Sequence, residues 1–286
     1  MQESPTPRPQ PADDGVTLRQ LQALAEFDEA VALQDEIWGA GFSDRVPASI
    51  LRIGQKVGGV SAGAFDERGR MLGFVFGLTG VRDGQLVHWS DMLAVREEAR
   101  GRQLGERLKR YQREIVRALG VRTMLWTFDP LVARKAHFNL NRLRARIAEY
   151  VPNFYGTNTG SILHGALPTD RFVAEWDVSA GVDEQDGDST AAHELPADAP
   201  RVVMPTAGNV RVLDPLSSSA RVLVSVPIDI ETILGADPDL ALAWRLATRH
   251  ALMHYLGRGY QVAAFHRGND ATLPAYELRR SLSLHA

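Results

Sequence analysis

One stretch of the sequence, residues 85–120, constrains the fold more than any other. Its first part, from Val87 to Val95, alternates in the way expected of a strand that is covered on both sides. A basic, glycine-bearing turn follows. Beyond the turn, apolar residues recur at three- and four-residue steps and predict a long amphipathic helix. These residues are Leu104, Leu108, Tyr111, Ile115 and Leu119.

The turn between this strand and this helix has the properties of a phosphate-binding site. The first N–H groups of a helix lack intrahelical partners, and here they point back toward the end of the strand. Aligned peptide dipoles add roughly half a positive charge at the same place. Arg100 and Arg102 lie in the turn itself. The sequence therefore predicts an anion site at the start of the helix.

The composition excludes several kinds of site. The chain has 286 residues, of which 44% are hydrophobic and 23% charged, as in an ordinary soluble globular protein. A net charge of -3 gives no reason to expect a nucleic-acid partner. The chain contains no cysteine, so disulfides, thiolate metal sites and a cysteine nucleophile are excluded.

The beginning of the chain and its hydropathy bear on location. Residues 1–14 contain prolines and acidic residues, without the basic and apolar regions of a signal peptide. No apolar run approaches the length of a membrane span. We therefore expect a cytoplasmic protein with no membrane partner.

Taken in order, the periodic segments predict a series of strands and helices. Two apolar, glycine-rich runs separated by a polar turn predict a hairpin near the middle of the first half. The expected strands cover residues 16–19, 57–65, 71–78, 87–95, 123–128 and 172–178, and the expected helices cover residues 27–38, 47–56, 104–119 and 132–149.

The first run of the hairpin contains a pattern that suggests a different chemistry. Gly59-Val60-Ser61-Ala62-Gly63 matches the Gly-x-Ser-x-Gly elbow of serine hydrolases. That elbow needs a strand before the serine and a helix directly after it. Here a polar turn and a second strand follow instead. A packed strand of small residues is the favoured interpretation, and a serine hydrolase using Ser61 is the weakest alternative.

The last part of the chain predicts a second folded region. Residues 179–200 are acidic and small, as in a solvated linker. Beyond them lie a strand at residues 221–228, a helix opened by Asp237 and stopped by Gly257, and a strand at residues 260–266. The expected organisation is a disordered tail at residues 1–15, a first domain at residues 16–178, an acidic linker at residues 179–200 and a C-terminal β-α-β subdomain at residues 201–286.

Residues 95–105 resemble the acyl-CoA pyrophosphate loop of the GNAT superfamily of N-acyltransferases, whose signature is Gln/Arg-x-x-Gly-x-Gly/Ala. Arg100 and Gly105 match the ends of this signature, and Gln103 stands where the first glycine is usual. The strand, loop and helix also follow in the required order. The resemblance implies an α/β (α+β) fold with a central mixed, mostly antiparallel sheet flanked by helices. It also implies an acyl-CoA co-substrate and, in a first domain of this kind, two helices between the first two strands.

The resemblance assigns cofactor contacts to particular residues. In this superfamily the strand that carries the loop and the next strand splay apart, and the backbone of the first pairs with the pantetheine arm. Polar residues of the following helix reach toward the cofactor. The implied cofactor-binding residues are Met92, Leu93, Ala94, Val95, Arg100, Gly101, Arg102, Gln103, Leu104, Gly105, Glu106 and Asn139.

The resemblance also raises the question of the acid and the base. Many GNAT enzymes carry a tyrosine that protonates the leaving thiolate, but Leu140 stands in its place and Tyr155 is the candidate substitute. His88 and Asp91 are candidate general bases that point to opposite faces of the strand. His88 has a suitable unperturbed pKa, whereas Asp91 needs its pKa raised by burial. For each of these residues, a hydrogen-bonded structural role is the competing interpretation.

A wider pattern is similar to a group of large bacterial GNAT proteins, mostly uncharacterised. It consists of Asp129-Pro130-Leu131 together with residues 152–156 and 167–171. Some members of this group are thought to use succinyl-CoA on amino acids, which requires a cation for the distal carboxylate. The available cations are Arg134, Arg142 and Arg144. They do not decide between acetyl-CoA and succinyl-CoA.

The sequence thus predicts a CoA-dependent N-acyltransferase that moves an acetyl or succinyl group to a small-molecule amine by direct attack. No metal is expected, because His250 and His254 lack the glutamate of a His-Glu-x-x-His helix. A degenerate member that senses acyl-CoA without turnover is the alternative, favoured by Gln103 and the missing tyrosine. The C-terminal subdomain would shape the acceptor pocket or form a homodimer contact.

Overall fold

The computed structural model describes residues 10–11, 14–156, 159–161, 165, 167–179, 196, 198–214, 216–269 and 271–280. Most of the expected tail and of the expected linker therefore lies outside the described residues. The chain divides into two compact units. The first unit comprises Met1–Trp126, Gly160–Ile162 and Trp176–Gly181, and the second comprises Thr127–Thr159, Leu163–Glu175 and Val182–Ala286. This division falls inside the predicted first domain, after Trp126.

The larger sheet has the strand order β1-β2-β3-β4-β5-β6-β8-β7. The pairing of β5 with β6 is parallel, and the other pairings described for this sheet are antiparallel. The predicted mixed, mostly antiparallel sheet is thereby confirmed. Its strands are β1 Gln10–Pro11, β2 Thr17–Gln20, β3 Val60–Phe65, β4 Met71–Arg82, β5 Gln85–Val95, β6 Thr123–Phe128, β7 Arg146–Val151 and β8 Arg171–Asp177.

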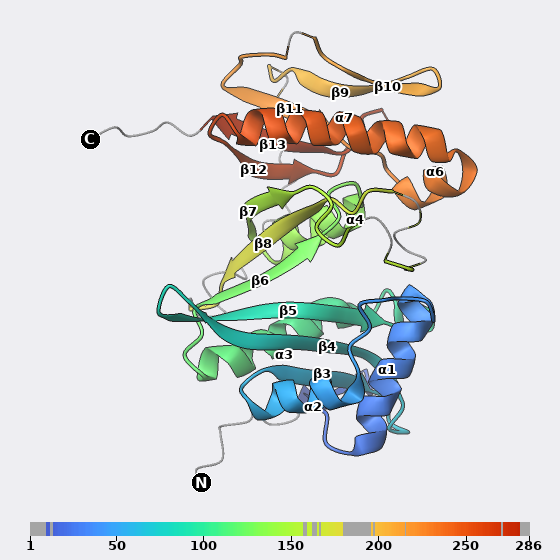
Figure 1. Ribbon diagram of the computed structural model, residues 1–286, viewed down its shortest axis with the longest axis vertical. Helices are drawn as coiled ribbons and strands as arrows, with labels where there is room; N and C mark the ends of the chain where they lie inside the picture. Colours follow the sequence, from blue (N-terminus) through green and yellow to red (C-terminus); the bar gives the residue numbers. More distant parts are fainter. Residues whose placement is uncertain are drawn as a thin grey trace. The chain divides into compact units, whose positions relative to one another are not determined.

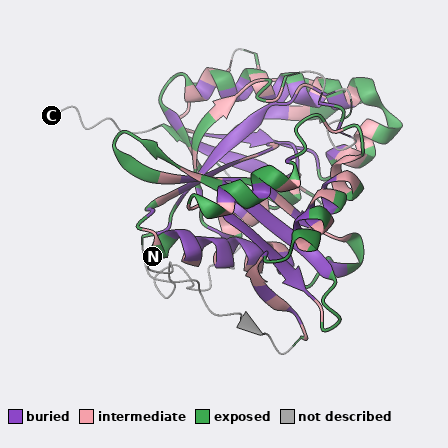
Figure 2. Cartoon of the chain, turned by 60° about the horizontal axis from the view of Figure 1, so that its bottom comes forward, coloured by how far each residue is buried: buried purple, intermediate pink, exposed green. Residues whose placement is uncertain are grey.

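Helices cover both faces of the sheet in the first unit (Figure 1). α1 (Leu24–Trp38) and α2 (Ala48–Lys56) lie on one face, where Phe27, Leu33 and Leu51 join the buried cluster. α3 (Leu104–Ala118) lies on the other face and buries the stripe expected from its sequence. Figure 2 shows strands that are buried along much of their length and helices whose outer faces are exposed.

A β-bulge in β5 changes which face its side chains meet. Ser90 pairs with Gly77 and Met92 pairs with Phe76, so Asp91 is the extra residue of β5. Ser90 binds a side chain of α3, whereas Met92 and Phe76 belong to the core under α1 and α2. The even-numbered residues of β5 therefore face α3 before Asp91 and face α1 and α2 after it.

β5 and β6 pair over only part of their length. The parallel register covers Val87↔Thr123, His88↔Met124 and Trp89↔Leu125, whereas the register of β5 with β4 continues to Val95. The part of β5 that leads to the loop is thus paired on the β4 side and lies beyond the register described with β6. The two strands separate as the resemblance implied.

Within the described residues, the second unit also contains a five-stranded sheet in the order β10-β9-β11-β13-β12. α7 opens at Asp237, whose Oδ1 accepts a hydrogen bond of 3.0 Å from the N–H of Leu240, as the sequence predicts. The other elements described in this unit are α4 Ala133–Ala136, the π-helix η2 His137–Arg142, β9 Arg201–Thr206, β10 Asn209–Val212, β11 Arg221–Ser225, α6 Ile230–Ala236, α7 Pro238–Leu256, β12 Tyr260–His266 and β13 Ala275–Arg280.

The predicted helix over residues 132–149 is wrong in its second half. The helical stretch ends at Arg142, Arg144 adopts a left-handed conformation with φ +53°, and β7 begins at Arg146. The left-handed residue redirects the chain from the helix into the strand. In the described part of the chain, no helix has both the length and the apolar character needed to cross a membrane.

Candidate functional site

The loop between β5 and α3 is built on backbone conformations that differ from both elements. A 3-10 turn, η1 (Glu97–Ala99), leads into Arg100, which is extended. Gly101 then has φ +81° and Gln103 has φ +56°, both in the left-handed region. Glycine adopts this region freely, whereas a glutamine there carries a penalty of roughly 1–2 kcal/mol. Gln103 thus occupies a position at which a glycine would be unstrained.

Gln103 is the N-cap of α3, and its backbone closes the first turn. Its carbonyl accepts the N–H groups of Glu106 and Arg107, each at 3.1 Å. The N–H groups of Leu104 and Gly105 precede these first helical bonds and point out of the helix end. With the helix dipole, these N–H groups have the orientation that an anion site requires, and the binding of an anion here stays a prediction.

The start of the loop is fixed to the sheet by Arg96. Its N–H donates to the carbonyl of Leu72 at 2.9 Å, and its Nε donates to the carbonyl of Met71 at 2.8 Å. Its guanidinium also pairs with Glu36 of α1. These contacts hold the end of β5 and the loop in one place, so the helix N-terminus is preorganised.

The predicted cofactor-binding residues of β5 form the strand that leads into this loop. Met92 and Ala94 are buried, and Leu93 and Val95 are partly buried. All four pair with β4. In a strand, alternate backbone groups point away from each neighbour, so this segment also presents donors and acceptors on its β6 side. Their use by a pantetheine arm stays a prediction.

Asp91 lies at the bulge, with a side chain that is largely accessible to solvent. Although the residue is exposed, desolvation of its carboxyl by the surrounding protein raises the pKa of Asp91 above the ordinary value, and the charge of Asp44 acts in the same direction. The side chain of Trp89 donates a hydrogen bond and opposes this shift only in part. A carboxylate that is exposed, lies on the strand that leads to the loop and has a raised pKa suits the role of a general base.

His88 does not suit that role. Its ring is fully buried and both nitrogens are engaged: Nδ1 lies 2.9 Å from Thr79 Oγ1 and Nε2 lies 3.0 Å from Gln112 Nε2. Burial lowers the pKa of His88 to about 3, and the charge of Lys109 adds to the shift. The structure favours the competing interpretation, a hydrogen-bonded residue that joins β5 to α3.

Tyr155 and Asn139 belong to the second unit. Tyr155 OH lies 2.8 Å from Thr127 Oγ1, its N–H donates to Thr169 Oγ1 at 3.1 Å, and the guanidinium of Arg171 lies 5.2 Å above its ring. Asn139 is buried in the π-helix. These contacts describe well-anchored residues, and their roles as acid and cofactor ligand stay predictions.

Ser61 has no elbow around it. It lies within β3, in a hairpin with β4, and its hydroxyl donates to the carbonyl of Leu51 at 2.8 Å. The side chain is fully buried. A nucleophilic role for Ser61 is therefore excluded by the local structure.

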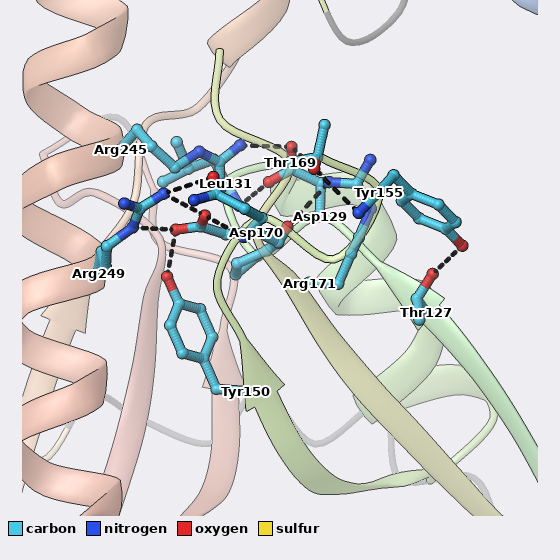
Figure 3. Close-up of polar contacts among 12 residues, drawn as sticks. Thr127, Asp129, Leu131, Tyr150, Tyr155, Thr169, Asp170, Arg171, Arg245 and Arg249 are labelled. Atoms are coloured by element: carbon cyan, nitrogen blue, oxygen red, sulfur yellow. Dashed lines mark hydrogen bonds and ion pairs between the residues drawn. The ribbon is translucent and has the colours of Figure 1, made fainter. Parts of the chain in front are cut away.

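The second unit holds a buried ionic cluster that sequence reasoning missed (Figure 3). Asp170 accepts hydrogen bonds from Arg249 at 2.5 Å and 2.9 Å and from Tyr150 at 2.5 Å. Asp129 pairs with Arg245 at 2.6 Å. The arginines lie four residues apart on α7, next to its apolar stripe. That spacing was the available sign that they face inward.

The cations proposed for a succinyl carboxylate differ in their surroundings. Arg134 forms two hydrogen bonds with Glu231, of 2.7 Å and 2.9 Å, so its guanidinium is already paired. Arg142 and Arg144 flank the end of the π-helix. Within the described residues, no group of three or more histidine, aspartate or glutamate side chains could hold a metal ion.

No protein-family model and no curated protein sequence matches the chain. Solved structures do resemble it. The ribosomal-protein-S18-alanine N-acetyltransferase from Escherichia coli is 16% identical, with a TM-score of 0.45 over 61% of this chain and 97% of that one. A protein from Desulfovibrio desulfuricans assigned to the GNAT family is 17% identical, with a TM-score of 0.44 over 57% and 99%. An aminoglycoside 6'-N-acetyltransferase complexed with coenzyme A is 13% identical, with a TM-score of 0.42 over 57% and 98%. The predicted resemblance to GNAT proteins thus recurs among solved structures as a likeness of fold, and values this low carry no conclusion about activity.

Proposed function

We propose that the protein is a CoA-dependent N-acyltransferase that moves an acetyl or succinyl group from acyl-CoA to a small-molecule amine. The observation that carries the proposal is the loop of residues 100–105. It follows β5, whose pairing with β6 stops before the strand ends, and it leads into α3, whose first N–H groups point outward. A diphosphate next to a strand edge is the ligand that this combination fits.

The binding roles follow from the backbone. The N–H groups of Leu104 and Gly105 would hold the diphosphate, and Arg100, whose side chain is 60% exposed, would add charge. The edge of β5 from Met92 to Val95 would hydrogen-bond the amide groups of pantetheine. Because these are main-chain contacts, they depend on the conformation of Gly101 and Gln103 more than on side-chain identity.

The chemistry would be a direct transfer. Asp91 accepts a proton from the ammonium form of the acceptor, and the free amine attacks the thioester carbonyl. The nitrogen of the tetrahedral intermediate gives its second proton to solvent, and the intermediate collapses with cleavage of the C–S bond. The departing thiolate takes a proton from Tyr155, which solvent then reprotonates, or directly from water. A positioned base contributes roughly 10² to 10⁴-fold to such a rate. A cysteine-bound acyl-enzyme is excluded because no cysteine is present, and Ser61 is buried.

A non-catalytic acyl-CoA sensor is the second candidate. It is favoured by the strained Gln103, which replaces the usual glycine, and by Leu140 at the place of the usual tyrosine. The sensor and the enzyme share the binding site and differ only in turnover. A cytoplasmic location and a homodimer also stay predictions.

One assay separates these candidates. The protein is incubated with acetyl-CoA or succinyl-CoA and a set of small amines, and released thiol is read with a disulfide reagent, to which a cysteine-free protein contributes no background. Amine-dependent thiol release supports the enzyme. Binding of CoA by calorimetry without thiol release for any amine supports the sensor. Absence of CoA binding refutes both.

A further inference from the structure

An acidic residue from the N-terminal part of the first unit lies at the same loop. Asp14 Oδ2 is 2.8 Å from Arg107 Nη1 and 3.4 Å from Arg102 Nη2. Arg102 Nη2 also donates to the carbonyl of Asp14 at 2.8 Å. One arginine from the loop and one from the start of α3 therefore converge on a single residue.

The turn that carries Asp14 is itself well defined. Gly15 has φ +72°, and a Cβ at this position would lie 2.8 Å from Glu67 Oε1. The N–H of Val16 donates to Asp14 Oδ1 at 3.2 Å, and Arg107 Nη2 reaches the carbonyl of Val16 at 3.4 Å. Burial alone would raise the pKa of Asp14, but the hydrogen bond from Val16 and the charges of the arginines lower it overall. Asp14 is thus a carboxylate at neutral pH.

The two arginines are the cations nearest to the predicted anion site along the chain. Arg102 lies between the left-handed residues Gly101 and Gln103, and Arg107 donates its N–H to the carbonyl of Gln103. An anion held at the start of α3 would attract both guanidinium groups, which already bind the Asp14 carboxylate. Two anions would then compete for the same donors.

We propose that Asp14 is an intramolecular competitor for Arg102 and Arg107, and that a phosphate group of the ligand displaces it. This inference rests on the proposed function, which makes CoA the ligand. The side chains of Asp14 and Arg102 are 38% and 39% exposed, so the pairing is weak and screened by salt, and displacement is easy. Asp14 keeps the affinity for phosphate-bearing ligands below the value that the loop alone would give.

The test is calorimetric titration of CoA into the wild type, Asp14→Asn and Glu114→Gln at low ionic strength. Glu114 pairs with Arg117 at the other end of α3, so its variant removes one negative charge from the same unit without touching the loop. Asp14→Asn is expected to lower the Kd for CoA by roughly two- to fivefold, the size of one exposed ion pair. Glu114→Gln is expected to leave it unchanged. Pantetheine, which has no phosphate, is expected to bind all three proteins equally.

The outcomes distinguish this inference from the proposed function. If the wild type binds CoA and Asp14→Asn binds it equally or more weakly, Asp14 orients the arginines instead of competing, and the inference is overturned while the function stands. If none of the proteins binds CoA, the proposed function fails, and inorganic pyrophosphate becomes the probe. Tighter pyrophosphate binding by Asp14→Asn then still supports competition, and equal binding refutes it. Thermal unfolding of each variant confirms that it is folded.

Discussion

Gln112 donates a hydrogen bond to His88 across the interface of α3 and β5, with 3.0 Å between the two Nε2 atoms. The amide direction is set by Ser90, whose hydroxyl donates to Gln112 Oε1 at 2.7 Å. His88 Nε2 is therefore an acceptor, and the ring proton lies on Nδ1, which donates to Thr79 Oγ1. Thr79 Oγ1 in turn donates to the carbonyl of Gly58 at 2.6 Å, where this series of hydrogen bonds ends.

This arrangement predicts a stability that falls in acid. The folded state holds the pKa of His88 at about 3, mainly through burial, against 6.5 in an unfolded chain. Below pH 6.5 the unfolded state therefore binds a proton that the folded state does not, and stability decreases as the pH falls toward 3. The slope contributed by this group is about 1.4 kcal/mol for each pH unit. Urea unfolding between pH 7.5 and 4.5 measures it.

His88→Gln is the matched variant, because glutamine keeps a polar group and cannot titrate. It is expected to lower stability at pH 7.5 by about 1–3 kcal/mol and to flatten the dependence on pH. Equal slopes for the variant and the wild type would show that the pKa of His88 is the same in the folded and unfolded states.

Strands and helices whose ends are marked by local residues were predicted correctly from the sequence. β6 and β12 begin and end at the predicted residues, and α7 does so because Asp237 and Gly257 mark its ends. The predicted helix failed past Arg142 because the residues of β7 combine charged and apolar side chains on an exposed strand, a pattern that also fits a helix. β13 was missed because Ala275–Arg280 is specified by pairing with β11 and β12, which are distant in sequence.

The residues of the candidate site were likewise predictable only where the signal is local in the sequence. The loop was predicted because its chemistry is local, since Gly101 and the start of α3 are adjacent in the chain. The choice between His88 and Asp91 was not predictable, because the bulge at Asp91 and the burial of His88 depend on β4 and α3. Asp14 lies far from the loop in sequence, so nothing in the sequence pattern linked it to Arg102.

Gly101→Ala tests the left-handed conformation of the loop. Nothing lies within 4 Å of a Cβ at this position, so its effect is purely conformational, and we expect a loss of about 1–2 kcal/mol in stability and weaker CoA binding. Gly80→Ala is the control, because its Cβ also meets open space but its φ is not left-handed. Chemical unfolding measures the stability of both variants, and calorimetry measures their binding of CoA. Equal effects of the two would remove the conformational argument.

Gln103→Gly tests the strain at the N-cap. Relief of the left-handed penalty, offset by the greater freedom of glycine in the unfolded chain, predicts a gain of roughly 0.5–1 kcal/mol in stability. The variant also matches the GNAT loop signature in full, so under the proposed function CoA is expected to bind at least as tightly. Unfolding by urea and titration with CoA are the measurements. A loss of stability would mean that contacts of the Gln103 side chain outweigh the strain.

Asp170→Asn tests the buried cluster of the second unit. The carboxylate is fully buried and paired with Arg249, so its removal leaves a charge uncompensated and is expected to cost about 3–5 kcal/mol. Glu231→Gln is the control in the same unit. Its partner Arg134 is 63% exposed, and the expected cost is below about 1 kcal/mol. Similar costs for the two variants would argue that solvent reaches Asp170.

Asp91→Asn tests the proposed base, with Asp44→Asn as the companion variant. If Asp91 accepts the proton of the amine, its replacement lowers kcat by roughly 10² to 10⁴-fold and leaves the Kd for acyl-CoA unchanged, because the diphosphate is held elsewhere. The wild-type rate falls with decreasing pH as Asp91 is protonated. Because the pKa of Asp91 is raised, this acidic limb of the pH–rate profile lies at a higher pH than an ordinary aspartate would give. Since the charge of Asp44 helps to raise that pKa, Asp44→Asn moves the limb to lower pH and keeps catalysis. Rate profiles of the three proteins between pH 5 and 9 check this. A limb that does not move in Asp44→Asn, or a fully active Asp91→Asn, would assign the proton transfer to another group.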